Sequence, residues 1–115
     1  MEGTVKIGGH EVKMRASAAT PVFYRKKFGR DCIVDLSPFM AGQEMADFSV
    51  FENLAYIMAK RADPEGVPDD PVEWLDQFDS ATAILDALPE IMAIWVASQK
   101  TTSTAKKKSV PRNVK

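Results

Sequence analysis

Apolar and polar residues alternate near the start of the chain, which is the pattern of a β-strand with one buried face. Every second position is apolar in residues 5–7 and again in residues 12–14. Gly8-Gly9 lies between the two runs, and glycine tolerates the positive φ of a tight turn. The pattern predicts a β-hairpin over about residues 3–15. Its apolar face must pack on other elements or on a partner, because a lone hairpin is marginal in water.

The segment TPVFYRKKFG, residues 20–29, has the end signals of a short helix. Thr20 is a favourable N-cap, Pro21 suits the first helical position, and Gly29 suits a left-handed C-terminal residue. The aromatic side chains share one face, and the basic side chains project from the opposite one. We interpret the aromatic stripe as facing the core and the basic residues as solvated. An RNA platform would need exposed aromatics in a longer basic field.

The middle of the chain predicts a second, longer helix. Ser49 and Glu52 have the spacing of a capping box, and apolar residues recur behind them at helical intervals. Lys60-Arg61 falls in the last turn, where positive charge complements the helix dipole. The sequence therefore predicts a helix over about residues 49–62.

The segment before this helix is less regular. Residues 32–34 form a brief apolar run, and Ser37-Pro38 offers a second helix cap and start. Residues 38–48 either extend the following helix or form a shorter one of their own. Gly42 weakens both alternatives, because glycine destabilises a helix interior.

Prolines and acids interrupt the chain after residue 62. The stretch DPEGVPDDP, residues 63–71, holds four acids, but its three prolines disrupt the frame of a calcium-binding loop. Asp70 then caps a short helix in VEWLDQF, and a last helix is expected from Ser80. Pro89 removes one backbone donor and should bend this helix or restart it.

Composition divides the 115 residues into two unequal parts. Residues 100–115 carry six of the fifteen basic residues and no acid, so residues 1–99 carry nine basic and sixteen acidic residues. We expect a single domain over 1–99, followed by a flexible, disordered basic tail over 100–115. The expected fold is α+β and mostly helical, with an N-terminal hairpin and four to five helices.

The sequence offers little material for catalysis. One histidine, His10, and one cysteine, Cys32, lie outside any nucleophile or metal-binding motif, and no phosphate-binding loop is present. We therefore expect no enzyme activity, no metal site and no cofactor. The single cysteine and the absence of a signal-like start favour a reducing, intracellular setting. The longest apolar stretch is broken by charges and Pro89, so no membrane span is expected.

Three segments together resemble a known family. TPVFYRKKFGRDCIVDL, VEWLDQFD and ALPEIMAIWVASQKTTSTAKKK, in this order and spacing, are similar to the tail assembly chaperones of long-tailed bacteriophages and prophages of Gram-positive bacteria. The resemblance extends over nearly the whole chain. YRKKFGRD and LPEIMAIW, running into the basic end, are its most telling parts. We know of no catalytic residues in this family.

The resemblance implies a role in phage morphogenesis inside the host bacterial cytoplasm. Such proteins bind the tape measure protein and keep its hydrophobic helical segments soluble while tail tube subunits assemble around it. They are absent from the finished virion. Many members are also made in a longer form by programmed ribosomal frameshifting. Consecutive lysine codons suit such a site, which here points to Lys106, Lys107 and Lys108.

A protein that shields apolar helices needs exposed apolar surface of its own, and methionine supplies adaptable contacts. Burial in the core is the ordinary interpretation of each such residue. As the partner-binding surface we propose residues of the segment 38–48 and one face of the last helix, namely Phe39, Met40, Met45, Phe48 and Trp95. Surplus apolar faces on an acidic body would also permit self-association.

Two alternatives belong to other classes. The first is a small nucleic-acid-binding module that uses the basic tail and a basic helix face, composed of Arg25, Lys26, Lys27 and Arg30. The formal charge of −1 does not favour it, because no field of the whole molecule attracts nucleic acid. The second is a structural subunit that stays in the virion.

Overall fold

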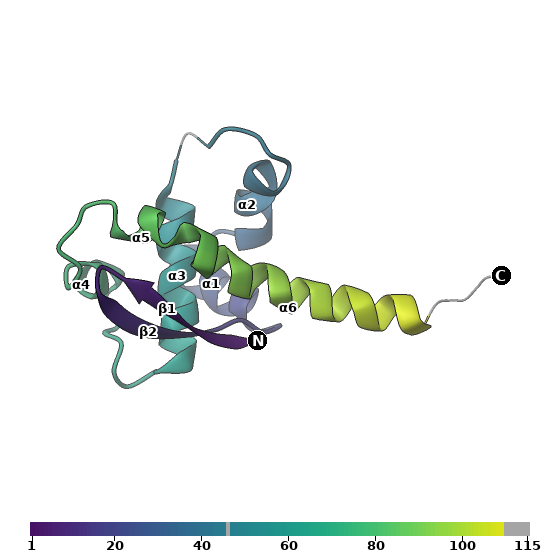
Figure 1. The fold of residues 1–115 in the computed structure, drawn as a ribbon, viewed down its shortest axis with the longest axis horizontal. Helices are drawn as coiled ribbons and strands as arrows, with labels where there is room; N and C mark the ends of the chain where they lie inside the picture. The colour runs from purple at the N-terminus through teal and green to yellow at the C-terminus, as the bar shows by residue number, and fades with distance from the viewer. Residues whose placement is uncertain (46, 110–115) are drawn as a thin grey trace.

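The computed structural model describes the backbone of residues 1–45 and 47–109 and the side chains of residues 1–45 and 47–99. Within these residues an N-terminal antiparallel hairpin is followed by six helices (Figure 1). This confirms the expected α+β, mostly helical class, with one helix more than the sequence predicts. None of the helices described is long and apolar enough to traverse a lipid bilayer.

The hairpin forms where the alternation predicts it. Strands β1 (Glu2–Ile7) and β2 (His10–Arg15) pair in the register that places Val5 opposite Val12. Gly8 and Gly9 have φ values of 55° and 85°, which only glycine adopts readily. β2 packs on α3, while β1 contacts α5 and α6. The buried face consists of Val5, Ile7 and Met14.

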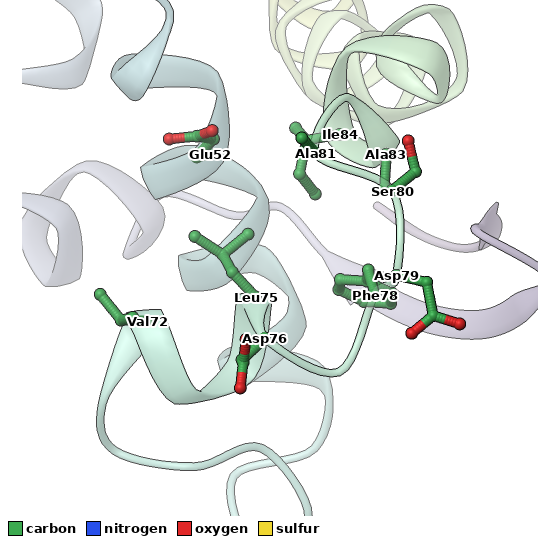
Figure 2. A pocket seen from close by; sticks show the side chains of 10 residues that line it. All are labelled: Glu52, Val72, Leu75, Asp76, Phe78, Asp79, Ser80, Ala81, Ala83 and Ile84. Carbon is green, nitrogen blue, oxygen red and sulfur yellow. The ribbon is translucent and has the colours of Figure 1, made fainter.

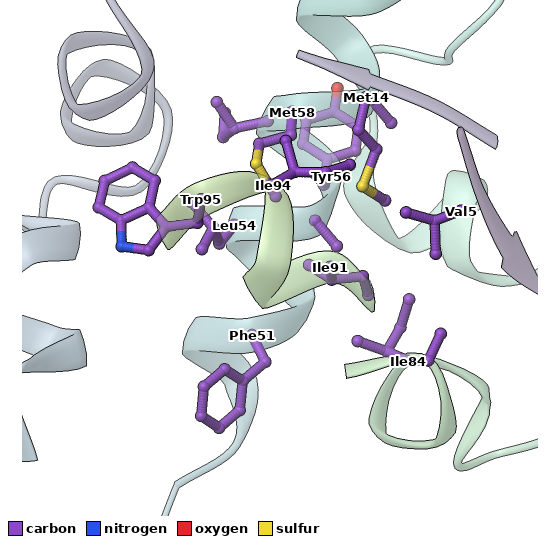
Figure 3. Packing of buried hydrophobic residues seen from close by; sticks show 14 of the residues in the cluster. Val5, Met14, Phe51, Leu54, Tyr56, Met58, Ile84, Ile91, Ile94 and Trp95 are labelled. Carbon is purple, nitrogen blue, oxygen red and sulfur yellow. The ribbon is translucent and has the colours of Figure 1, made fainter. Parts of the chain in front are cut away.

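The helix α3 (Ser49–Ala62) lies at the centre of the domain and contacts β2, α1, α2, α4 and α5. Its residues from Val50 to Ala59 are buried, except for Glu52 and Asn53, which are half-buried. Figure 3 shows the resulting core, in which side chains from β1, β2, α3, α5 and α6 converge. Because α3 is buried on nearly all sides, its residues 54–59 form a continuous apolar run.

The predicted capping box of α3 is wrong. The residue at the N-cap position is Phe48, and no side chain there makes a capping bond. Instead, Oδ1 of Asp47 accepts a hydrogen bond from the backbone N–H of Ser49 at 2.9 Å. The preceding loop delivers an aspartate to the helix start, and a carboxylate is the better complement to the positive end of the dipole.

The helix α1 (Thr20–Phe28) follows the sequence prediction at its end but not at its start. Gly29 is left-handed with φ of 70°, and its N–H donates to the carbonyl of Arg25, as predicted. The N-cap position belongs to Ala19, so the prediction for Thr20 is wrong by one residue. Thr20 is fully buried, and its hydroxyl accepts a bond from the N–H of Ser17 at 2.9 Å.

The helix α2 spans Cys32–Met40, so the predicted helix start at Ser37-Pro38 is wrong. The Asp31 side chain caps the helix by accepting from the N–H of Ile33, and Pro38 lies inside it. Proline cannot donate to the carbonyl of Val34 one turn earlier. The Ser37 hydroxyl donates to that carbonyl instead, at 2.8 Å. This local replacement allows the helix to continue past Pro38.

The segment 38–48 is therefore divided. Its first three residues end α2, and the described residues from Ala41 to Phe48 form no helix. Gly42 has φ of 78°, which explains the break after α2. Residue 46 lies outside the described residues.

The C-terminal third contains three helices. The helix α4 (Pro71–Leu75) begins as predicted, with the Asp70 side chain accepting from the N–H of Val72. The expected helix from Ser80 is split into α5 (Ala83–Asp86) and α6 (Leu88–Ser109), and Pro89 stands in the first turn of α6. Pro89 thus restarts the helix, because its missing N–H costs least in a first turn.

The helix α6 extends away from the rest of the molecule toward the C-terminus (Figure 1). The sequence places the end of regular structure at Gln99, whereas the backbone of α6 is helical to Ser109. The side chains beyond Gln99 and all of residues 110–115 lie outside the described part. For residues 100–109 of the predicted flexible tail only the helical backbone is described, so the tail over 100–115 stays a prediction.

Candidate functional site

The outward side of α2 carries three of the seven exposed large apolar side chains among the described residues. Ile33, Val34 and Met40 are 54%, 64% and 48% exposed, respectively. The opposite side of the same helix is buried through Cys32 and Leu36. Large apolar residues that stay exposed together on one helix often mark an interaction surface.

An aromatic residue extends this surface beyond the helix. Phe48 is 47% exposed and stacks on Phe51 of α3, with ring centroids 6.3 Å apart. Phe39 at the end of α2 packs edge-on against the same Phe51 at 5.1 Å. Phe51 thus joins Phe48 to the end of α2. We call the following four exposed residues the α2 surface: Ile33, Val34, Met40 and Phe48.

The structure places the predicted partner-binding residues in different environments. Met40 and Phe48 are exposed and belong to the α2 surface. Phe39 and Met45 are half-buried and pack against the core. The side chains of Lys106, Lys107 and Lys108 lie outside the described residues.

The prediction that Trp95 belongs to the partner-binding surface is wrong, because its side chain is only 3% exposed. It belongs to the core cluster in Figure 3 and offers no surface to a partner. Its indole Nε1 is buried without a hydrogen-bond partner among the described residues. Trp95 therefore belongs to the apolar side of α6 that packs into the core.

The sequence interpretation missed Ile33 and Val34. The sequence shows their apolar run, but it does not predict the helix that presents them, because Ser37-Pro38 has the pattern of a helix start. Asp31 as an N-cap ahead of a mostly apolar segment is the signal that could have found this helix. Only the packing of Cys32 and Leu36 against the core decides that Ile33 and Val34 face outward.

A polar cluster lies beside α2 on its inner side. Arg30 donates to both carboxylate oxygens of Asp35 at 2.8 Å, and the Tyr24 hydroxyl donates to the same carboxylate at 3.3 Å. These three residues line a cavity of about 250 Å³ between α1, α2, α3 and the loop that contains Met45. Burial, then the charge of Asp35, raises the pKa of Tyr24 to about 12, so the phenol stays a neutral donor. The cluster fixes the end of α1 to α2.

This cluster makes stability depend on pH through Asp35. The hydrogen bond from Arg30 is the largest cause that holds the pKa of the Asp35 carboxyl below its ordinary value of 3.8. The unfolded chain then binds this proton more readily than the folded protein does. The stabilisation is present above pH 3.8 and is lost as the pH falls through the lower folded pKa.

Asp35→Asn should therefore flatten the acid limb of the stability curve. At pH 7 the variant should be less stable than the wild type, and from about pH 5 downward its urea midpoint should fall less steeply. Urea denaturation at a series of pH values measures this difference. Glu44→Gln, an exposed acid lining the same cavity, is the control and should leave the wild-type slope. Equal slopes for Asp35→Asn and wild type would contradict the role of the pair.

Of the two residues considered for catalysis, Cys32 is buried and His10 is exposed. Cys32 is buried in α2, and burial raises the pKa of its thiol to about 11, which keeps it protonated at neutral pH. His10 packs edge-on against Phe78 with ring centroids 5.5 Å apart. No group of three or more His, Cys, Asp or Glu side chains suited to a metal ion occurs among the described residues.

The basic face of α1 is exposed, but part of it is engaged by the chain itself. Lys27 Nζ donates to the backbone carbonyl of Asp69 at 2.6 Å, and Arg30 is held by Asp35. Arg25 and Lys26 remain exposed beside them. Two of the four residues of the predicted nucleic-acid face therefore already have anionic or carbonyl partners.

Comparisons with protein-family models, with curated proteins and with solved structures found no match for this chain.

Proposed function

We propose that this protein is a tail assembly chaperone of a long-tailed bacteriophage or prophage. It binds the tape measure protein in the host cytoplasm, keeps the apolar helical segments of that protein soluble, and helps to recruit tail tube subunits. It is released before the virion is complete. The observation that supports this proposal best is the α2 surface, where four large apolar side chains face solvent. The sequence resemblance points to the same role.

The geometry of the α2 surface suits a helical client. Ile33 and Met40 lie two turns apart on one side of α2, and Val34 widens that side. A second helix can place its own apolar stripe along such a row, as in other helix-packing interactions. Methionine adjusts its side chain to differently shaped partners. The surface therefore fits a client with many similar but not identical apolar helices.

The nucleic-acid alternative has weaker support. Lys27 and Arg30 are held by groups of the same chain, and the body over residues 1–99 carries sixteen acids against nine bases. Phosphate binding would need a coherent basic surface, and its affinity would fall steeply with salt. Capture of apolar helices should persist or strengthen as salt rises.

The proposal predicts a tape measure gene next to the gene of this chain, and it is tested by co-expression of the two proteins. The double variant Ile33→Ser, Val34→Ser should lose at least about tenfold of the co-purified tape measure protein, because two exposed apolar contacts are removed. Its own unfolding free energy should stay within about 0.5 kcal/mol of wild type, since both residues are exposed and serine has a similar helix propensity.

Val22→Ser is the matched control. Val22 is 39% exposed on α1 and lies outside the α2 surface. This variant should co-purify with the tape measure protein as the wild type does, at low and at high salt. If the α2 double variant kept the tape measure protein soluble and bound in wild-type amounts, the proposal would be refuted.

A further inference from the structure

A second surface feature lies away from α2, between α3, α4 and the start of α5. It is a groove of about 320 Å³ (Figure 2). Its apolar lining includes Leu75, Phe78 and Ile84, and the last two are buried in the core. Val72 at its border is 69% exposed, the highest exposure among the large apolar residues described. Phe78 and Ile84 thus form a largely covered apolar floor, and Val72 and the half-buried Leu75 are the apolar side chains of the groove that reach solvent.

Three carboxylates stand around this floor. Glu52 comes from α3, while Asp76 and Asp79 come from the turn after α4 (Figure 2). The lining contains no lysine, arginine or histidine, so its formal charge is −3 from these three groups. The lining therefore carries negative charge on more than one of its sides.

The two aspartates of the groove differ from all others in the chain. The sequence contains nine aspartates, and seven have a side-chain partner in the described structure. Those seven cap helices or turns, or bond to Arg30, Lys60 or Thr82, and they are Asp31, Asp35, Asp47, Asp63, Asp69, Asp70 and Asp86. Within residues 1–45 and 47–99, Asp76 and Asp79 have no such partner. The chain thus uses its aspartates structurally except in the groove.

We propose that this groove docks a segment of a partner protein that carries an apolar side chain flanked by lysine or arginine. The apolar side chain would lie on Val72 and Leu75, and the flanking cation would pair with Asp76 or Asp79. Charge complementarity selects this occupant, because an acidic or purely apolar segment would leave the carboxylates unpaired or repelled. The inference goes beyond the proposed function and does not depend on the α2 surface.

The test uses the full chain and two synthetic helical peptides of equal length, one built from leucine and lysine and one from leucine and glutamate. Isothermal titration calorimetry at low salt measures the affinity of each. The leucine–lysine peptide should bind the wild type, and Asp76→Asn combined with Asp79→Asn should weaken it by about three- to tenfold. Ala81→Trp, which fills the groove from its exposed border, should weaken it as well.

The matched control is Glu11→Gln combined with Glu65→Gln, which changes net charge equally but lies outside the groove lining. It should leave the affinity for the leucine–lysine peptide unchanged. Equal weakening by the control would overturn the inference, because it would show a general charge effect. Equal affinity of the groove variant and the wild type would overturn it too.

Two further measurements separate this inference from its alternatives. The variant Ile33→Ser, Val34→Ser should keep wild-type affinity for the leucine–lysine peptide, so failure of the chaperone proposal would not affect the groove. Sedimentation velocity identifies a second copy of this chain as the occupant if the wild type self-associates and the aspartate variant does not. That result would overturn the assignment to a different partner protein.

Discussion

Replacement of Trp74 by alanine should lower the free energy of unfolding by about 3–5 kcal/mol, the largest effect expected of any single substitution discussed for this protein. The Trp74 side chain is 2% exposed. Its ring packs edge-on against Tyr56 at 5.8 Å and against Phe78 at 5.2 Å. The substitution removes apolar contact and leaves a cavity between α3 and α4 that these neighbours fill only in part.

Urea denaturation followed by far-UV circular dichroism measures this loss. Trp74→Phe serves as the companion variant, because it keeps an aromatic ring and should cost clearly less than alanine. The companion also keeps the experiment interpretable if the alanine variant does not fold. A loss below about 1 kcal/mol for Trp74→Ala would show that α4 is not anchored by this side chain.

The second large effect is expected at Lys60. Its Nζ donates to the backbone carbonyls of Pro64 and Val67 at 2.8 and 2.6 Å, and it pairs with Asp69 at 2.9 Å. The ammonium group thus sits inside the acidic loop that follows α3. The positive charge that the helix dipole favours in the last turn also organises the loop.

Lys60→Met should cost about 2 kcal/mol of unfolding free energy, because hydrogen bonds from a charged donor are lost and two carbonyls lose their partner. Methionine keeps much of the apolar stem, so the loss reports the ammonium group. Urea denaturation gives the total. Hydrogen exchange of residues 63–70 shows whether the loss is local.

Asp69→Asn separates the two kinds of contact that Lys60 makes. The Asp69 side chain is 95% exposed, so its ion pair is screened by water and should contribute less than the two carbonyl bonds. We expect Asp69→Asn to be much milder than Lys60→Met. Equal losses would indicate that the ion pair, rather than the carbonyl bonds, holds the loop.

These stability predictions bear on the proposed function. The rigid centre formed by α3, the hairpin and Trp74 supports two surfaces with different chemistry. The α2 surface is apolar, whereas the groove combines an apolar floor with three carboxylates. A client with apolar helices and basic flanks could use both, while each surface is testable by itself. Stability and binding therefore require separate variants.

Local sequence signals were sufficient for several elements. Gly8-Gly9 between two alternating runs determined the hairpin, and Gly29 determined the end of α1. Asp70 before Pro71 determined the start of α4. In each case the required φ value or capping bond involves residues within a few positions of one another. A short sequence pattern therefore contains everything that determines the local structure.

Other features depended on bonds or contacts that the sequence pattern did not single out. Pro38 indicated a helix start, but the Ser37 hydroxyl replaces the missing donor and α2 continues. The α3 start has the pattern of a capping box at Ser49, but the preceding loop places Asp47 at the helix end instead. The boundaries of α2 and the capping of α3 therefore differ from the prediction where a nearby polar side chain bonds a backbone group.

The sequence by itself determined the hairpin, the central helix, the acidic body and the absence of recognisable catalytic motifs. The tertiary structure alone decided which apolar residues face solvent, enclosing Trp95 while leaving Ile33 and Val34 open. Helical spacing states which side chains share a face, but exposure depends on which other elements cover that face. That covering is set by long-range packing, to which local periodicity is blind.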